Sequence, residues 1–255
     1  MVEEGAREGD GERRVKRTGR HSVRRINALA AAIGAKTYLE IGVSRGDTFF
    51  SIDVPRKIAV DPDFQFDWQA EQKENVVFNQ VTSDEWFLKC DVSRKFDLIF
   101  LDGLHTFEQT FRDFCNSLAV AHDRTVWLID DVVPTDPYSA WPERLEAVRL
   151  RKKTFGLDVR GWQGDVFKVV FMIHDFFPMM SFRTINSNGN PQTLVWKAAR
   201  SNFKPLFNSA EAVSRLTFFD FQRHFDVMHP GTEQEIMAAF TSSYGAEGLG
   251  KIHND

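Results

Sequence analysis

The first half of the chain alternates short, continuously apolar runs with helical or polar stretches. Five of these runs are interpreted as strands: Thr37–Ile41, Lys57–Val60, Val76–Val81, Phe96–Leu101 and Thr125–Ile129. Continuous apolarity, as opposed to strict alternation with polar residues, is typical of strands that are covered on both faces. Between the last two runs, apolar residues recur on one helical face from Phe107 to Ala119. The pattern therefore predicts an open α/β sandwich, in which crossover helices connect the strands of a parallel sheet.

In the second half of the chain, the pattern predicts strands that are joined by a tight turn and not by a crossover helix. Asp165–Phe177 is a long apolar segment, interpreted as a helix, that ends before Pro178. The turn-forming residues Asn186–Pro191 separate two further strand-like runs, Ser181–Ile185 and Thr193–Trp196. A turn cluster between two such runs indicates an antiparallel hairpin. We therefore expect the sheet to end in two antiparallel strands.

The same pattern divides the chain into three parts. Residues 1–20 alternate acidic, basic and glycine residues with almost no apolar content, so we expect a disordered, charged tail. Residues 21–200 contain the predicted sheet and its helices. Residues 201–255 are rich in phenylalanine and are expected to form a helical extension that packs on the domain or covers it as a lid.

Composition and charge exclude several classes of protein. The 255 residues carry 32 Lys and Arg against 36 Asp and Glu, a net charge of −4, which argues against a surface built to coat nucleic acid. The basic stretch Arg149–Lys153 is typical of a solvated helix face. No apolar run is long enough to span a membrane, and no secretion signal is recognisable, so we expect no membrane partner. Two cysteines without a CxxC motif fit a reducing cytoplasm and argue against a disulfide scaffold or a zinc site.

Polar residues follow the predicted strands directly, and the first such segment is Glu40-Ile-Gly-Val-Ser-Arg-Gly46. Its glycines allow the backbone to turn tightly and to approach a ligand that a Cβ atom would obstruct. The spacing differs from the G-x-G-x-x-G fingerprint of dinucleotide-binding folds. The acidic residue before the loop would repel a pyrophosphate but would suit a ligand that carries an ammonium group.

Asp61 follows the second predicted strand, in the sequence Ala-Val-Asp61-Pro-Asp63. An acid at this place can accept hydrogen bonds from both hydroxyls of a ribose. The alternative is an aspartate that only forms a turn before Pro62. Taken with the glycine loop, ribose binding is the favoured interpretation.

With Ser83-Asp84 after the third strand and Asp102-Gly103 after the fourth, these segments resemble the class I S-adenosylmethionine-dependent methyltransferases. The resemblance implies a Rossmann-like, doubly wound sheet of seven strands, mostly parallel, with a C-terminal antiparallel hairpin. It also implies a cofactor-binding set made of Glu40, Gly42, Ser44, Gly46, Asp61, Ser83, Asp84, Asp102 and Gly103. In that family, the Gly42–Gly46 loop would cradle the methionine part of S-adenosylmethionine, Asp61 would hold the ribose, and Ser83 with Asp84 would lie beside the adenine.

A further group of acids lies directly after the fourth and fifth predicted strands. Asp102, Asp130 and Asp131 would converge above the sheet if these strands lie near each other, and such a cluster repels itself unless protons or a cation neutralise it. A divalent cation with oxygen ligands, such as Mg²⁺, would do so. His105, three residues after Asp102, could act as a general base in the same cavity. The alternatives are that the two adjacent acids cap the following loop and that His105 belongs to a helix start near Thr106.

This group is similar to that of the catechol O-methyltransferases, in which acids at these strand ends bind Mg²⁺ and a lysine three positions after the first acid is the base. The chain looks closer still to the macrocin O-methyltransferase-like enzymes, which methylate small molecules in bacteria. Here His105 stands in place of the lysine, and Asp131 replaces an amide common in the catechol group. The resemblance thus implies Asp102, Asp130 and Asp131 as metal ligands, with His105 and Asp102 as catalytic residues.

The function expected from the sequence is O-methylation of a hydroxylated small molecule such as a sugar, an antibiotic or a phenolic metabolite. S-adenosylmethionine would be the cofactor, with Mg²⁺ as a further one. The alternatives are a metal-independent methyltransferase with another acceptor, a nicotinamide-dependent oxidoreductase, and a cofactor-binding module without turnover. Nucleic acid is not an expected partner, and the phenylalanine-rich C-terminal part could pack against a second subunit.

Overall fold

The computed structural model describes residues 9–156 and 161–249. The strands in these ranges are β1 (Thr37–Ile41), β2 (Arg56–Val60), β3 (Val76–Asn79), β4 (Phe96–Leu101), β5 (Ala121–Ile129), β6 (Met180–Ile185), β7 (Gln192–Lys197) and β8 (Pro230–Gly231). The α-helices are α1 (Gly9–Ile33), α2 (Trp68–Glu71), α3 (Ser83–Lys89), α4 (Phe107–Ser117), α5 (Arg144–Phe155), α6 (Phe167–Phe176), α7 (Ala210–Ser214), α8 (Phe218–Arg223) and α9 (Glu233–Leu249). Short 3-10 helices are η1 (Phe49–Ser51), η2 (Leu118–Val120) and η3 (Phe225–Met228).

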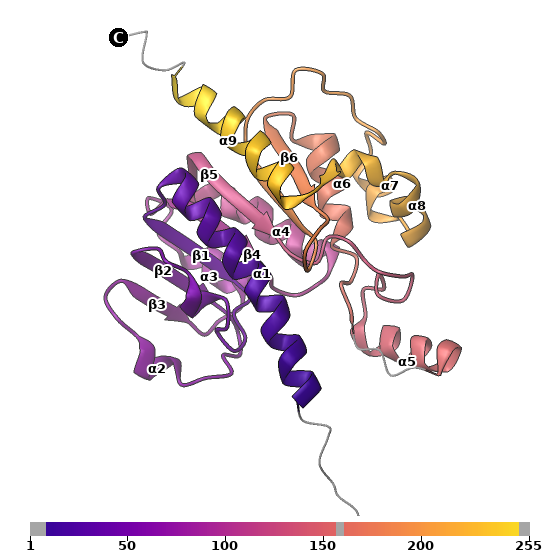
Figure 1. Cartoon of the computed structure of the whole chain (residues 1–255), viewed down its shortest axis with the longest axis horizontal. Coiled ribbons are helices and arrows are strands. Elements are labelled where there is room, and N and C mark those ends of the chain that lie inside the picture. The colour runs from indigo at the N-terminus through magenta and orange to yellow at the C-terminus, as the bar shows by residue number, and fades with distance from the viewer. Residues whose placement is uncertain (1–8, 157–160, 250–255) are drawn as a thin grey trace, which may run out of the picture.

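All the strands belong to one sheet, in the order β3-β2-β1-β4-β5-β7-β6-β8 (Figure 1). Strands β1 to β5 are parallel to their neighbours in this group, whereas β7 runs antiparallel to both β5 and β6. The chain proceeds outward from β1 to β3 on one side and from β4 to β5 on the other, so the strand order reverses between β1 and β4. Loops diverge at such a reversal and leave a crevice at the carboxyl ends of the strands. The expected fold class is confirmed.

The sheet contains one strand more than the seven that the sequence predicts. Strand β8 is only two residues long and pairs parallel to β6, with Pro230 opposite Thr184 and Gly231 opposite Ile185. Proline and glycine are depleted in strands, and a two-residue strand has no apolar periodicity. The pairing therefore comes from tertiary packing and left no signal in the sequence.

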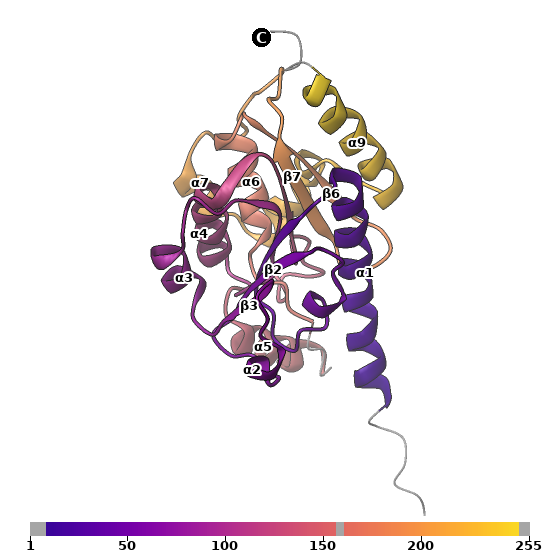
Figure 2. The same ribbon diagram turned by 90° about the vertical axis from the view of Figure 1, so that its left-hand side faces the viewer.

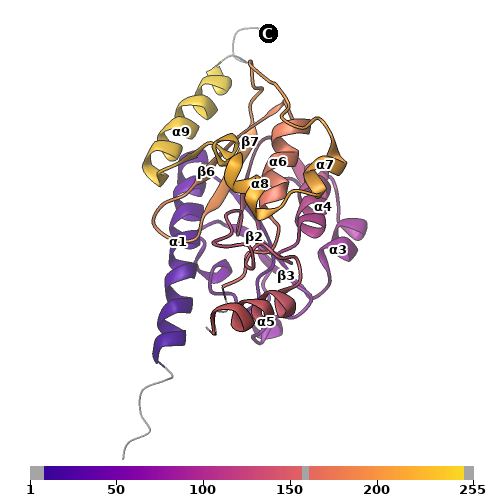
Figure 3. The same ribbon diagram turned by 90° about the vertical axis from the view of Figure 1, so that its right-hand side faces the viewer.

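Helices cover both faces of the sheet, as Figures 2 and 3 show from opposite sides. Helices α3, α4, α6, α7 and α8 contribute to an apolar cluster on one face, and α1, α9 and η1 to a cluster on the other. Strand β5 connects the two clusters, because Trp127 belongs to the first and Val126 and Leu128 to the second. This alternation explains why the strand is apolar at every position in this stretch.

Helix α1 begins at Gly9, inside the segment 1–20 for which the sequence predicts disorder. That prediction rested on the scarcity of apolar residues, but the glutamates and arginines of this segment are themselves good helix formers. The helix continues into the apolar face that contains Ile26 and Leu29, both fully buried. Residues 1–8 of the predicted tail lie outside the described residues.

The C-terminal part of the chain contributes to both faces of the sheet. Residues of α7 and α8 join the cluster around α6, residues of α9 join the cluster around α1, and β8 extends the sheet between them. Residues 250–255 lie outside the described residues. In the described part of the chain, every helix is too short or too polar to cross a membrane.

The first prediction concerns the core where α4 meets β5. Trp127 is fully buried, packs edge-on against Phe114, and donates from its Nε1 to the hydroxyl of Ser117 at 2.9 Å. We expect Trp127→Ala to lower the free energy of unfolding by about 3–5 kcal/mol, because it leaves a cavity between two packed layers. Denaturant unfolding followed by circular dichroism measures this loss. Leu88→Ala is the control, since Leu88 is 84% exposed, and an equal loss in both variants would contradict the prediction.

Candidate active site

A large cleft of about 1250 Å³ lies at the carboxyl ends of the central strands. The predicted site residues that line it are Glu40, Gly42, Ser44, Asp61, Ser83, Asp84, Asp102, Gly103, His105, Asp130 and Asp131. Gly46 is not part of this lining, and a Cβ atom at its position would meet the ring of Phe50 at 2.4 Å. The structure thus brings together almost all of the residues that the sequence singled out.

The floor of the cleft is formed where the loop after β1 approaches the end of β4. Gly42 has a φ of +86°, and a Cβ atom on it would lie 2.0 Å from the carbonyl oxygen of Asp102. The amide of Asp102 in turn donates to the carbonyl of Ile41 at 2.9 Å. Only glycine satisfies both the left-handed backbone and this close approach. Gly42 is therefore required for the floor itself, whichever ligand the cleft binds.

Asp61 shapes the glycine loop from the neighbouring strand β2. Its Oδ2 accepts hydrogen bonds from the amides of Val43 at 2.7 Å and Ser44 at 2.8 Å, and its Oδ1 accepts from the amide of Asp63 at 2.8 Å. A carboxylate has about four acceptor positions, so capacity for a further hydrogen bond is left. Asp61 is thus both a structural support of the loop and an acceptor at the cleft surface.

Glu40 is a buried acid at the end of β1. The hydroxyl of Tyr38 donates to its Oε2 at 2.6 Å. Burial raises the pKa of Glu40 well above its usual range, the charges of Asp102 and Asp61 raise it further, and the Tyr38 hydrogen bond and Lys57 oppose this shift. A cationic ligand in the cleft would favour the ionised form. This arrangement fits a ligand that carries an ammonium or sulfonium group.

A polar group on α4 borders the cleft beside Ser83 and Asp84. The Nε2 of Gln109 donates to Ser83 Oγ at 3.1 Å and to Asp113 Oδ1 at 3.0 Å. Arg112 donates to Asp84 at 2.9 Å, and this hydrogen bond lowers the pKa of Asp84. Gln109 lines the cleft but was missed by the sequence analysis, since a polar residue in the first turn of a helix has no distinctive spacing.

His105 lies between two of the predicted acids. Its Nδ1 is 3.0 Å from Asp131 Oδ2, and its Nε2 is 3.5 Å from Asp102 Oδ1. One ligand atom from each of these three side chains lies within 4.8 Å of the others, a spacing that could hold a metal ion. The ring of His105 also stacks on Trp162, with centroids 5.3 Å apart and an interplanar angle of 17°. The imidazole is therefore held from three sides.

The charges around His105 set its protonation state. Burial lowers the pKa of the imidazole, but the negative charges and hydrogen bonds of Asp131 and Asp102 raise it by more, so that it lies well above the usual value. Burial raises the pKa of Asp102 to about 6, against the opposing effect of His105. The carboxylates thus make the imidazole bind a proton more tightly than a free histidine does, which strengthens it as a base.

Asp130 is placed differently from the other two acids. It is buried, its Oδ1 accepts from Asn190 Nδ2 at 2.6 Å and from the amide of Asp131 at 2.9 Å, and it is not part of the three-residue group. Burial raises its pKa well above the usual range, and the charges of Asp102 and Asp131 add to this. The clustered side chains are therefore Asp102, His105 and Asp131, whereas the sequence predicted Asp102, Asp130 and Asp131.

The segment around Trp162 forms one wall of the cleft. Gly164 has a φ of +62°, and a Cβ atom there would lie 1.6 Å from the carbonyl oxygen of His105. Asp165, the first residue of the segment that the sequence predicts as a helix, accepts from the amide of Phe107 at 2.7 Å, at the start of α4. In the described C-terminal part, no residue beyond Asn190 lines the cleft.

Comparisons with known proteins agree with this geometry. Residues 39–132 match the family model described as a methyltransferase domain. A candidate O-methyltransferase from Klebsiella pneumoniae is 17% identical to the chain and aligns over 76% of it and 92% of its own length, with a TM-score of 0.50. Cofactor-bound Rv0187 from MTB is 14% identical, aligns over 71% of this chain and 81% of its own, and has a TM-score of 0.52.

A third solved structure is the plantazolicin methyltransferase BpumL in complex with a monoazolic desmethylPZN analog and SAH. It is 8% identical and aligns over 73% of this chain and 86% of its own, with a TM-score of 0.50. None of the curated proteins matches the chain. The shared fold and the domain match confirm the predicted resemblance to class I S-adenosylmethionine-dependent methyltransferases, and they decide against the nicotinamide-dependent alternative.

The second prediction concerns the stability of the acidic group. Because the pKa of Asp130 is higher in the folded than in the unfolded state, the protein loses stability as the pH rises from about 4, the unfolded value, through the folded pKa. Asp130→Asn keeps the acceptor oxygen but cannot ionise. We expect this variant to have a higher Tm than the wild type, with a difference that grows from about pH 5 to about pH 8.

Thermal unfolding across this pH range measures the effect. Glu74→Gln, which removes an exposed carboxylate outside the cleft lining, is the control and should show no such pH-dependent gain. A Tm difference for Asp130→Asn that is negative or independent of pH would refute the stated cause.

Proposed function

We propose that this methyltransferase transfers the methyl group of S-adenosylmethionine to a hydroxyl oxygen of a small molecule. The observation that carries the proposal is the imidazole of His105, which lies between Asp102 and Asp131 at the surface of the cleft. A methyl transfer to oxygen must remove the hydroxyl proton, and a histidine in this position can accept it. The description of the Klebsiella pneumoniae protein as an O-methyltransferase also supports oxygen as the acceptor atom.

The cofactor-binding residues are proposed from their place in the cleft. The loop of Gly42 and Ser44 would hold the methionine part, with the buried Glu40 behind it as the acid that a cationic group would ionise. Asp61 would accept a hydrogen bond from the ribose hydroxyls at an acceptor position that its contacts with the loop do not occupy. Ser83 and Asp84 would lie beside the adenine. Gly46 would support the loop without touching the ligand.

The chain's own residues would contribute orientation and proton transfer. Bound S-adenosylmethionine supplies the methyl group for an in-line displacement, in which the bond from carbon to sulfur breaks as the bond to oxygen forms. Holding the acceptor in line is worth about 7–11 kcal/mol in such reactions. Asp131 would keep Nδ1 of His105 as the donor, so that the deprotonated Nε2 takes the acceptor's proton. Trp162, stacked on the imidazole, would fix the plane of the ring and form a flat wall for the acceptor.

A second candidate is a metal-assisted transfer, favoured by the donor spacing of Asp102, His105 and Asp131. The residues fit a divalent cation in part: the two carboxylates are ligands that Mg²⁺ prefers, whereas an imidazole nitrogen suits transition metals better. A bound cation would lower the pKa of the acceptor hydroxyl. If His105 itself ligates the cation, it cannot also be the base, because its other ring nitrogen then carries the ring proton. A cation held by the acids alone would leave His105 able to take the acceptor's proton.

The third prediction tests His105 as the base. His105→Ala is expected to lower kcat by about 10²–10⁴-fold while leaving the affinity for S-adenosylhomocysteine unchanged. Release of S-adenosylhomocysteine from S-adenosylmethionine, with catechols, simple phenols and free sugars as acceptors, measures turnover, and calorimetry measures affinity. His122→Ala is the matched control, because His122 makes a similar contact with Asp97 at 2.9 Å outside the cleft lining. Full activity of His105→Ala would refute the proposed role.

The fourth prediction separates the two candidates. If His105 acts as the base without a cation, activity survives dialysis against EDTA and does not rise when Mg²⁺, Mn²⁺ or Zn²⁺ is added back. Loss of activity with EDTA and its return with one of these cations would instead establish the metal-assisted reaction. Asp130→Asn tests the metal-assisted reaction separately from the base. Asp130 belongs to the metal-binding set predicted from the sequence, but it contacts neither ring nitrogen of His105.

A further inference from the structure

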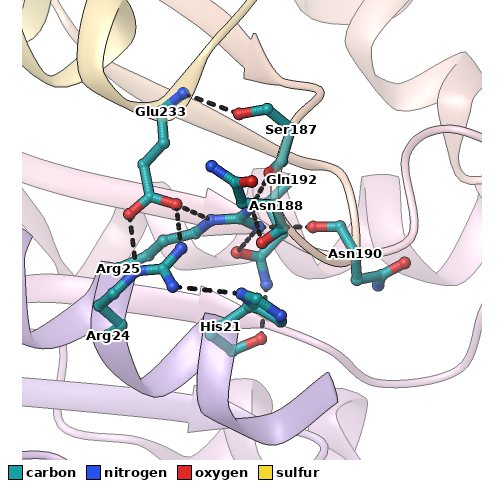
Figure 4. Close-up of polar contacts among 9 residues, drawn as sticks. His21, Arg24, Arg25, Ser187, Asn188, Asn190, Gln192 and Glu233 are labelled. Carbon is teal, nitrogen blue, oxygen red and sulfur yellow. Dashed lines mark hydrogen bonds and ion pairs between the residues drawn. The ribbon is translucent and has the colours of Figure 1, made fainter. Parts of the chain in front are cut away.

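A second polar network lies beside the acidic group, where α1 and α9 meet the turn between β6 and β7 (Figure 4). At its centre is Arg25 of α1, whose side chain is fully buried. The guanidinium donates to Glu233 Oε2 at 3.0 Å, to Gln192 Oε1 at 2.9 Å and to the carbonyl of Ser187 at 2.7 Å. It also donates to the carbonyls of Asn188 and Asn190. All three nitrogens of the guanidinium therefore have partners.

This network fixes the shape of the turn, residues 186–191. A buried charge is costly unless it is paired and hydrogen-bonded, and Glu233, the first residue of α9, supplies the opposite charge. The planar guanidinium can serve several carbonyls at once, which a lysine ammonium cannot do in this geometry. The turn also lies directly against α1, because a Cβ atom on Gly189 would be 2.3 Å from the ring of His21.

One side chain of the turn, that of Asn190, reaches the candidate active site. The amide nitrogen of Asn190 donates to Asp130 Oδ1 at 2.6 Å and to Asp131 Oδ1 at 2.9 Å. The other oxygen of Asp131, Oδ2, is the one that lies 3.0 Å from Nδ1 of His105. Asp131 itself has a φ of +56°, a conformation that non-glycine residues rarely adopt and that the surrounding contacts must hold.

We propose that Arg25 and Asn190 are positioning residues: Arg25 holds the turn, Asn190 orients the carboxylate of Asp131, and Asp131 in turn orients His105. The inference rests on the proposed function in so far as His105 is the group that needs orienting. Without the side-chain amide of Asn190, no donor would bridge the two neighbouring carboxylates, because the backbone amide of Asp131 donates to Asp130 alone. Asp131 would then be free to rotate away from the imidazole.

The fifth prediction concerns the Nδ1 proton of His105, observed in the full chain with S-adenosylhomocysteine bound. In nuclear magnetic resonance spectra, the wild type should show a downfield Nδ1 proton that exchanges slowly with water and is absent in His105→Ala. In Asn190→Ala this proton should exchange about tenfold faster or more, as expected when a hydrogen bond to a charged group weakens. Arg25→Lys, which keeps the charge but loses the planar donor set, should have the same effect.

Arg24→Ala is the matched control. Arg24 also donates to Glu233, at 2.9 Å, and its Nη1 lies 3.3 Å from Nδ1 of His21, but it makes no hydrogen bond to the turn within the described residues, so the Nδ1 proton of His105 should be unchanged. Circular dichroism and the affinity for S-adenosylhomocysteine verify that each variant is folded. Slow exchange that persists in Asn190→Ala, a missing proton in the wild type, or an equal effect of Arg24→Ala would each overturn the proposal.

Turnover gives an independent readout that separates this proposal from the proposed function. Asn190→Ala should lower kcat with little change in KM for S-adenosylmethionine, and it should cause no further loss when combined with His105→Ala. Additive losses would mean that Asn190 acts by another route, which overturns the positioning role while His105 keeps its own. If His105→Ala keeps full activity, the proposed base fails, and the exchange experiment still decides whether Asn190 orients the ring.

Discussion

The repulsion among carboxylates at the ends of the central strands is the constraint on which the candidate site depends. Parallel strands deliver their following residues to one edge of the sheet, and in this chain those residues are acids. Each acid is stabilised by a different partner: Glu40 by the hydroxyl of Tyr38, Asp61 by the backbone of the glycine loop, and Asp131 by His105 and Asn190. Because the partners differ, the acids are held in different ways and can serve different tasks at the same edge of the sheet.

The two layers of helices stabilise the sheet against the repulsion among the acids at its edge. Apolar clusters on both faces of the sheet hold the strands in register, so that the loops after β1 and β4 approach each other within the distance that only Gly42 permits. The wall opposite the glycine loop is held in the same way, since Gly164 contacts the backbone of His105 and Asp165 contacts the start of α4. The cleft is therefore shaped by backbone contacts, and the side chains on its surface are left for binding and chemistry.

Local patterns predicted the strands, the hairpin and the acids at the strand ends, because each of these depends on a short stretch of sequence. They could not predict contacts between distant segments. Asn190 was interpreted as a turn residue, and its role is visible only once β7 is known to lie next to β5. Asp165 has the composition of a helix cap but serves another helix. The extra strand β8 likewise depends on packing, whereas the start of α1 at Gly9 follows the helix preference of glutamate and arginine, which a count of apolar residues does not register.

The bond between Arg25 and Glu233 joins residues that are 208 positions apart in the chain. During synthesis, strands β1 to β7 and the first helix are complete before α9 emerges from the ribosome, and until then the buried guanidinium lacks Glu233 as its counter-charge. Proteins generally fold from the N-terminus onward as they are made. In this protein the turn that borders the acidic group would thus lack one of its supports, the ion pair of Arg25, until α9 docks.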